Sequence, residues 1–342
     1  MKKILFFLAA LMFVASCAKD ATTTPVIKGE KVVSFKITSP KMQTRYGEGA
    51  EANKLFWAVY KDGQRLDDIS VIDHAEAVAI NMSVDVEITL MEGIDYDILF
   101  WAQNEDAPYT FDGEKVTIDY DALSANEEIY DAFFRNYHVD SEQTEPHRVE
   151  LRRPFAQLNI GTADTAKAQS AGFTVENTSI TVETCTVLNL ATGEASEPQE
   201  ITFEMNTKAD DTYGEAPDTF DIISMNYLLV NNDKVMTTVT LNAEGGNDAI
   251  EREYLNVPLQ RNHRTYILGD ILTSSKLFNV YINPAFEDED LFSEDNDANN
   301  GTDNGTTSVI YYTSTDGNIV EPRDMFDAGF EEVFGANIVS NT

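Results

Sequence analysis

Cys17 is the residue whose surroundings most clearly predict a chemical modification. It follows the apolar run Ile4–Val14, which begins behind two lysines, and two small residues separate the cysteine from that run. A bilayer-spanning helix needs about 20 apolar residues, so this run of eleven is too short to span a membrane. The segment is instead typical of a secretory signal.

The order Val14-Ala15-Ser16-Cys17 resembles the bacterial lipobox, in which the cysteine becomes the lipidated first residue of the mature protein. Residues 1–17 are therefore predicted to be a lipoprotein signal peptide. Two or more acyl chains, at about 0.8 kcal/mol per buried CH₂, would anchor the protein stably to a membrane. Residues 18–30 are polar and rich in threonine, as expected of a flexible tether. The alternative is a buried or disulfide-bonded Cys17, for which Cys185 is the only possible partner.

The remaining reactive residues show no spacing that predicts catalysis or metal binding. Neither HxxxH nor HExxH occurs, no cysteine pair could hold zinc, and both the Gly-rich phosphate loop and G-x-S-x-G are absent. Asp295, Asp297 and Asn299 alternate as in a calcium loop, but Thr306 stands where a bidentate glutamate is needed. We therefore expect that the protein is not an enzyme and that it binds neither a metal ion nor a cofactor. The four scattered histidines are His74, His138, His147 and His263.

The charge of the chain narrows the range of partners. The 342 residues include 24 basic and 59 acidic ones, and the formal net charge is −35. The negative electrostatic field of a protein with this charge repels the phosphates of nucleic acids, so nucleic acid is not an expected partner. The length is sufficient for two domains.

Alternation of apolar and polar residues predicts strands through most of the chain. The pattern is clearest at 33–37, 84–90 and 180–188, whereas 55–60 and 96–103 are continuous apolar runs. Many short strands without alternating helices predict an all-β chain of antiparallel sheets packed as sandwiches. Helical patterns are confined to 123–134 and to 165–171, where Asp164 is the expected N-cap.

We expect two tandem β-sandwiches, at 31–161 and 162–286, with Pro154 at a bulge or edge position of a strand over 149–160. Residues 287–307 contain eight acidic and no basic residues, which predicts an extended, disordered linker. Residues 308–342 predict a short hairpin with Asp316-Gly317 in its turn. This segment is too short for an independent domain and is expected to be the partial start of a further region.

Two stretches, LRRPFAQLNIGT (Leu151–Thr162) and Asn256–Phe286, resemble the fimbrillin-like (FimA/Mfa-like) surface lipoproteins of Bacteroides-type bacteria. The resemblance covers about 31–286. It implies two transthyretin-like sandwiches, which are Ig-like in architecture, and a lipid anchor in the outer membrane at the cell surface. The tail VIYYTSTDGNIVEP is similar to the segment that opens BspA-like leucine-rich repeat regions of the same bacteria.

In pilus subunits of the fimbrillin-like family, a protease acting after an arginine removes the first strand, and a neighbour's strand fills the groove. For this sequence, the resemblance implies that residues 32–38 form the removable strand and that the protease cleaves after Arg45. Arg65 is a poorer candidate because losing residues 57–60 as well would disrupt the core. The alternative is that Arg45 is an ordinary loop residue. The chain also departs from polymerising subunits, which end near the sandwich with a donor strand, because it continues into the acidic segment.

The resemblance implies three kinds of partner: the membrane through the N-terminal lipid, other pilus subunits, or a ligand on a host or bacterial surface. An alternative function is a glycan-binding surface lipoprotein for nutrient capture. That function requires an exposed flat aromatic platform, for which Tyr109, Tyr213 and Tyr227 are the candidates, because aromatic faces stack on sugar rings.

Overall fold

The computed structural model describes residues 29–39, 51–140, 147–213, 219–274, 278–283, 309–313 and 319–320. These residues form strands in four sheets with one short α-helix, which confirms the predicted all-β class. No helix in this described part of the chain is long and apolar enough to cross a membrane.

The strands and helices follow one another in this order. The first half contains β1 (Glu30–Thr38), β2 (Lys54–Lys61), β3 (Gln64–Arg65), η1 (Asp67–Ile69), β4 (Val78–Ala79), β5 (Ser83–Met91), β6 (Tyr96–Gln103), β7 (Tyr109–Phe111), β8 (Lys115–Ile118), η2 (Tyr120–Ala122), η3 (Glu128–Tyr130), β9 (Phe133–Val139), β10 (His147–Glu150) and β11 (Phe155–Thr162). The second half contains α1 (Thr165–Ser170), β12 (Asn177–Asn189), β13 (Ala195–Thr202), β14 (Asn206–Thr207), β15 (Asp211–Tyr213), β16 (Phe220–Leu229), β17 (Val235–Gly245), β18 (Asp248–Leu259), β19 (Arg264–Gly269), β20 (Phe278–Asn283), β21 (Val309–Thr313) and β22 (Ile319–Val320).

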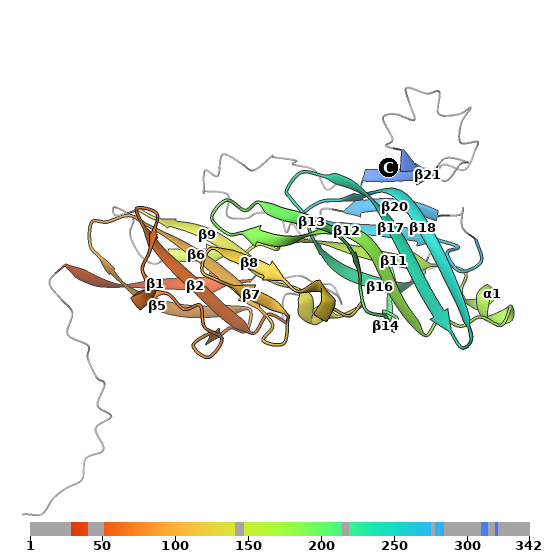
Figure 1. Ribbon diagram of the computed structural model, residues 1–342, viewed down its shortest axis with the longest axis horizontal. Coiled ribbons are helices and arrows are strands. Elements are labelled where there is room, and N and C mark those ends of the chain that lie inside the picture. Colours follow the sequence, from red (N-terminus) through yellow and green to blue (C-terminus); the bar gives the residue numbers. More distant parts are fainter. Residues whose placement is uncertain are drawn as a thin grey trace, which may run out of the picture.

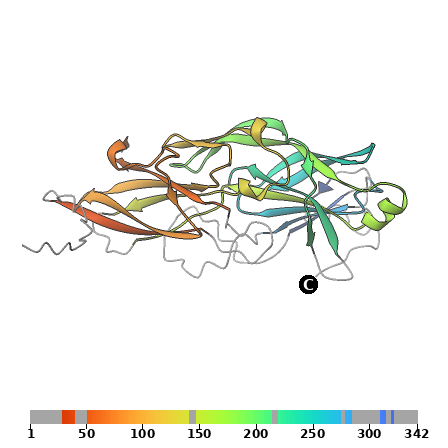
Figure 2. The ribbon, with the colours of Figure 1, turned by 90° about the horizontal axis from the view of Figure 1, so that it is seen from below.

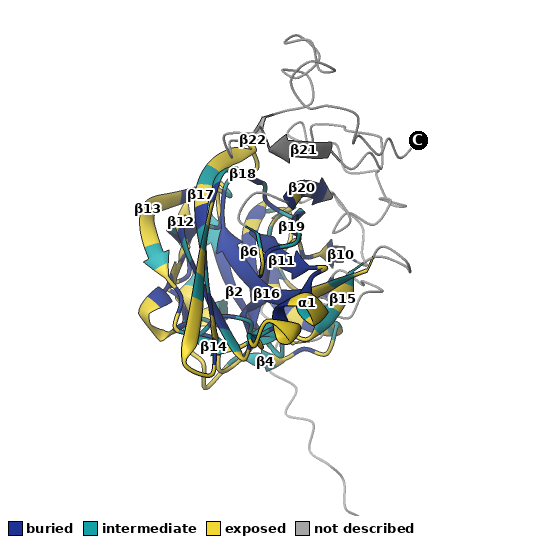
Figure 3. Cartoon of the chain, turned by 90° about the vertical axis from the view of Figure 1, so that its right-hand side faces the viewer, coloured by how far each residue is buried: buried dark blue, intermediate teal, exposed yellow. Residues whose placement is uncertain are grey.

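Two sandwiches lie end to end along the long axis of the molecule (Figure 1). The N-terminal sandwich packs the sheet β10-β1-β5 against the sheet β3-β2-β6-β9. The C-terminal sandwich packs β15-β16-β11-β19-β20-β21-β22 against β18-β17-β12-β8-β7, with β13 and β14 paired to β12. Figure 2 shows the same end-to-end arrangement from below. In Figure 3 the buried residues lie between the sheets, and the exposed ones follow β13 and α1 at the periphery.

The sheet of β2 and β6 is buried on both faces, which explains its continuous apolar sequences. Leu55 and Trp57 face the core of the N-terminal sandwich, whereas Phe56 and Trp101 pack toward the hairpin β7–β8. That hairpin belongs to the C-terminal sheet, because β8 pairs with β12. The sequences of β2 and β6 therefore lack the apolar–polar alternation of a strand with one solvent-exposed face. Both tryptophans are core residues.

Three expectations about local structure differ from the structure. The predicted strand over 149–160 is two strands, β10 and β11, with Pro154 between them. β11 pairs with β16 and β19, so it lies in the second sandwich although the expected boundary placed it in the first. The predicted helix over 123–134 is wrong; this segment holds only the one-turn helix η3 and then enters β9.

Two other expectations match the structure. The helix predicted over 165–171 is α1. The hairpin expected in the tail is formed by β21 and β22, and β21 extends the C-terminal sandwich by pairing with β20. The predicted turn residues of that hairpin and the linker 287–307 lie outside the described residues.

A fully buried ion pair joins the two sandwiches. The Arg153 guanidinium donates from Nε and Nη2 to the two carboxylate oxygens of Asp131, each at 2.6 Å, and both side chains are at most 1% exposed. The guanidinium also lies over the Phe133 ring, 5.0 Å from its centroid. A bidentate pair of this kind is directional, so it fixes the orientation of the two segments that carry it.

Asp164 ties the start of α1 to the loop after β19. It stands at the N-cap position, but its carboxylate bonds no amide of the helix and instead accepts from Leu272 N, Thr273 N (2.7 Å), Thr273 Oγ1 and Thr162 Oγ1. Burial alone would raise the Asp164 pKa, but these hydrogen bonds outweigh it and lower the pKa below its usual value.

Breaking the ion pair from one side is expected to destabilise the protein strongly. Arg153→Met leaves the Asp131 carboxylate buried without its counter-charge, which costs about 3–5 kcal/mol of unfolding free energy. Urea titration followed by tryptophan fluorescence measures the loss. The double variant Arg153→Met/Asp131→Leu should recover at least half of it, whereas simply additive losses would show that the two charges are not coupled.

Asp164→Asn is expected to lower the free energy of unfolding by about 1–3 kcal/mol at pH 7, because charged hydrogen bonds are lost. Since the folded pKa is lowered, this stabilisation is complete above the ordinary carboxyl pKa of about 3.9 and disappears as pH falls through the folded value. Urea titrations at pH 7 and below pH 4 should show the difference from wild type shrinking. The exposed Asp62→Asn is the control, and a pH-independent difference would contradict the assignment.

Candidate functional site

The candidate site is the groove that β1 occupies in the N-terminal sandwich. β1 lies between two neighbours: it pairs with β5 in antiparallel fashion over all nine residues, and with β10 in parallel fashion from Phe35 to Thr38. The alternation expected from the sequence is present, since Val33, Phe35 and Ile37 point into the core and are at most 6% exposed. These three side chains are the anchors that a strand needs in this groove.

Phe35 is the central anchor because it joins an aromatic cluster contributed by three other strands. Its ring stacks on His147 of β10, with centroids 5.0 Å apart and planes inclined by 26°. The rings of Phe100 and Tyr137 lie 6.1 and 6.2 Å away. His147 Nδ1 lies 3.2 Å from the Tyr137 hydroxyl, so the ring that faces β1 is itself held in place.

A small pocket adjoins β1 in the described part of the chain. This cavity of about 80 Å³ lies beside the first half of β1 and is lined in part by Lys31, Val33, Leu90 and His147. Van der Waals contacts are missing where such a space adjoins a side chain. The last carbonyl of β1, at Thr38, accepts from Leu151 N at 2.8 Å.

The two site residues expected from the sequence, Cys17 and Arg45, lie outside the described residues. Arg45 falls in the segment between the end of β1 and the start of β2. Cys185, the other cysteine, is a half-buried free thiol on β12, and burial raises its pKa. Its surroundings fit the small core residue that the sequence suggests.

The histidines and tyrosines do not converge on a common site. Each histidine has a different neighbour: His74 contacts Phe56, His138 bonds Asp97, His147 stacks on Phe35, and His263 bonds the Arg261 carbonyl. In the described part of the chain, no three His, Cys, Asp or Glu residues are grouped as a metal site. Tyr109 and Tyr227 are both 3% exposed, and half-buried Tyr213 stacks on Tyr266, so these tyrosines do not form the platform required for glycan binding.

Two of the shifted pKa values belong to buried groups that form structural hydrogen bonds. Burial raises the pKa of Tyr120 to about 12, although its hydroxyl bonds Thr184 and the Leu229 amide. Burial also lowers the pKa of Arg261 to about 10, and this side chain donates to the Val230 and Gly193 carbonyls. These groups lie in packed interiors and not in an open cleft, so they are unsuited to acid–base chemistry on a substrate.

A pocket of about 450 Å³ in the described residues lies on the C-terminal sandwich between β12 and the hairpin β17–β18. Its lining includes Ser179, Asn242, Glu244 and Ile250 but no histidine, lysine or arginine. It therefore combines carboxylates with hydroxyl and amide groups, but has no imidazole, ammonium or guanidinium group to complete an acid–base pair.

Comparison with known proteins identifies one family and several solved structures. The family of unknown function DUF6562 matches residues 24–316, which spans both sandwiches and β21. A candidate polysaccharide-binding protein from Bacteroides thetaiotaomicron has a TM-score of 0.44 and 11% identity, covering 74% of this chain and 96% of that one. A candidate adhesin from the same species has a TM-score of 0.44, 10% identity and coverage of 77% and 98%. The fimbrial anchor protein Mfa2 from Porphyromonas gingivalis has a TM-score of 0.38, 10% identity and coverage of 74% and 98%. No curated protein matches the chain.

Phe35→Ala is expected to lower the free energy of unfolding of the N-terminal sandwich by about 3–5 kcal/mol, because it leaves a cavity in the aromatic cluster. Trp57 lies in the same core, so urea titration followed by tryptophan fluorescence detects the change. Lys36→Ala, on the exposed face of the same strand, is the matched control and should change stability by at most about 0.5 kcal/mol. Equal losses in the two variants would contradict the role of Phe35 as the anchor of β1.

Proposed function

The chain belongs to the family of unknown function DUF6562, and we propose that it is a lipid-anchored structural or adhesive protein of the cell surface that assembles by strand addition at the β1 groove. The predicted lipidation of Cys17 supplies the anchor, and the fimbrillin-like resemblance supplies the assembly hypothesis. The place of β1 in its sheet is the observation that carries the proposal.

β1 is suited to exchange because it comes before every other described strand and yet occupies an interior position in its sheet. Removing it takes no residue from the opposite sheet of β2, β6 and β9. It would leave β5 and β10 with facing main-chain edges and a row of empty sites for apolar side chains. A strand with apolar residues at alternate positions could occupy these sites, and main-chain hydrogen bonds would supply its affinity.

The position of Arg45 favours it over Arg65 as the cleavage point. A cut after Arg45 falls between β1 and β2 and detaches β1 alone. A cut after Arg65 would also detach β2, whose Phe56, Trp57 and Val59 belong to both hydrophobic cores. The Arg65 side chain is also engaged, since its Nε donates to Asp67 at 2.6 Å and its Nη1 to the Asp112 carbonyl.

A non-enzymatic function agrees with the arrangement of the titratable groups. The described histidines are dispersed, and the groups with shifted pKa values serve packing and hydrogen bonding. No specific observation favours the glycan-binding alternative, because the tyrosines on which it depends are buried or stacked.

The test is to express the full-length chain in a bacterium with an arginine-specific surface protease and to analyse the surface material by mass spectrometry and gel electrophoresis. We expect a lipidated Cys17 terminus before cleavage, a species that begins at Tyr46 after it, and a ladder of high-mass assemblies. Arg45→Ala should abolish both the Tyr46 species and the ladder, because β1 then stays covalently attached.

Arg65→Ala is the matched control and should leave the cleavage and the ladder unchanged. A lipidated protein that reaches the surface without a Tyr46 species or a ladder would refute strand addition and leave an anchored stalk. A protein that carries no lipid at Cys17 would refute the anchor itself.

A further inference from the structure

The sheet edges of this protein differ in how well they are protected against pairing with another chain. An exposed edge strand offers unpaired N–H and C=O groups to any extended segment, and proteins protect such edges with prolines, bulges or short strands. Two long edges carry such devices: β13 has Pro198 beside the left-handed Glu197 (φ 57°), and β18 has Pro258 near the left-handed Asn256 (φ 55°). β7 and β15 are only three residues long, and β9 is bridged on its outer side from Phe134 to Arg152.

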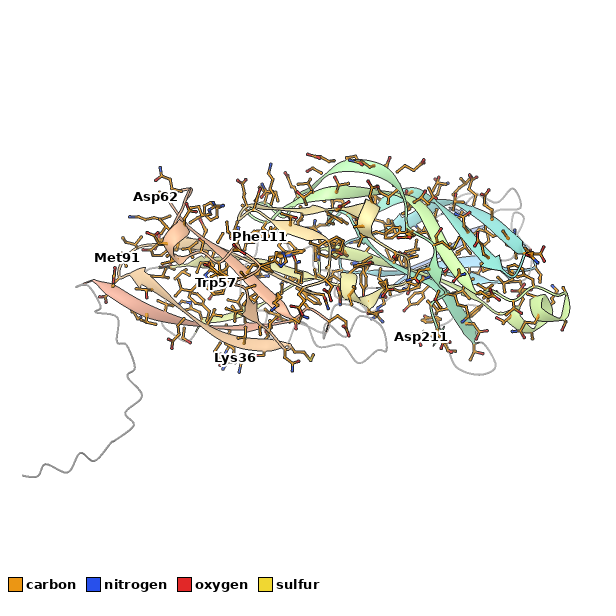
Figure 4. All side chains as sticks on the ribbon, turned by 60° about the horizontal axis from the view of Figure 1, so that its bottom comes forward. Lys36, Trp57, Asp62, Met91, Phe111 and Asp211 are labelled. Atoms are coloured by element: carbon orange, nitrogen blue, oxygen red, sulfur yellow. The ribbon has the colours of Figure 1, made fainter. Side chains whose placement is uncertain are left out.

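β5 carries none of these devices between Val84 and Met91; only at its start is Met82 left-handed (φ 59°) and Ser83 bridged to Asn81. Its nine residues, Ser83–Met91, contain no proline and no left-handed residue, and all of them pair with β1 on one side. On the other side no described strand pairs with β5, and it stands at the end of the order β10-β1-β5. In Figure 4, Met91 lies at one end of this ladder and Lys36 lies near the other. From Val84 to Met91, β5 is thus the longest edge in the described part of the chain that lacks a protective feature.

The exposed side chains of β5 include two carboxylates, which give this edge a negative charge. Val86, Ile88 and Leu90 are buried in the core and fix the strand in register, whereas Asp85 and Glu87 project from the exposed face. A neighbouring strand places its own side chains directly opposite these, about 4.5–5.5 Å away, where opposite charges attract. Such a pairing of opposite charges already occurs on the side of β5 that faces β1, where Lys36 lies opposite Asp85.

We propose that the free edge of β5 is a docking site for an extended strand of a partner protein that carries lysine or arginine at alternate positions. Main-chain bonds along β5 supply affinity, and Asp85 and Glu87 select the basic residues. The net charge of −35 further attracts a basic partner. A second copy of this chain is disfavoured, because full antiparallel overlap of two β5 strands places Glu87 opposite Glu87.

This docking site goes beyond the strand addition proposed above and uses a different surface. A donor strand in the β1 groove bonds the inner edge of β5, whereas the partner strand bonds its outer edge. Failure of cleavage or polymerisation therefore leaves this inference standing, and failure of peptide binding at β5 leaves the assembly hypothesis standing.

The experiment measures binding of acetylated nine-residue peptides to the full-length chain by isothermal titration calorimetry. The probe alternates lysine with valine, and the controls are a glutamate–valine peptide and the lysine peptide with N-methyl groups on alternate backbone amides. We expect the lysine peptide to bind about tenfold more tightly than either control. Amide hydrogen exchange should slow in Ser83–Met91 when it binds.

Glu87→Lys should weaken binding of the lysine peptide about three- to tenfold and strengthen binding of the glutamate peptide. Glu87 lies directly opposite Ser34 in the ladder, so the change places no like charge directly opposite it on β1, and Lys36 is only a diagonal neighbour. Glu253→Lys makes the same charge change on β18 and should leave both affinities unchanged. Equal binding of the N-methylated peptide, protection outside β5, equal effects of the two variants, or dimerisation through β5 would each overturn the proposal.

Discussion

The arrangement of the two sandwiches depends on the buried ion pair of Asp131 and Arg153. The chain passes between the sandwiches three times, and this pair ties the passage before β9 to the passage before β11. In the remaining passage, after β6, the buried Gln103 side chain accepts from Trp101 Nε1 at 2.6 Å and donates to the Tyr109 carbonyl. A buried polar group that loses its partners is costly, so each passage has little freedom to move. The two sandwiches are joined at these passages by polar contacts as well as by apolar packing.

The same junction explains why the sequence predicted the strands better than their grouping. Alternation identified β1, β5 and β12 because each has one face that is more exposed than the other, and continuous apolar runs identified β2 and β6. Nothing local marks the crossing before β11: Arg153 has the composition of a surface residue, and its partner Asp131 lies 22 positions earlier. The segment 123–134 shows a helical spacing, but Asn126 adopts a left-handed backbone (φ 68°) and bonds the Met225 amide, which prevents a continuous helix.

The groove itself was predictable only in part. Exchange of the first strand, which the resemblance implied, stays a prediction, whereas the alternation of its residues correctly identified the side that faces the core. The contact that defines the groove, Phe35 on His147, joins positions 112 residues apart, and parallel pairing of β1 with β10 has no local signature. The alternation of His147 and Val149 as buried residues in β10 was a signal that this histidine belongs to a core.

If the proposed strand addition occurs, the geometry of the groove favours exchange of a strand over its simple release. β1 bonds main-chain groups on both sides, so its departure breaks two ladders at once and uncovers the sites of Val33, Phe35 and Ile37. An empty groove would expose apolar surface and unpaired edges together, and both are unfavourable in water. A donor strand that enters as β1 leaves forms the same bonds again without passing through the empty state.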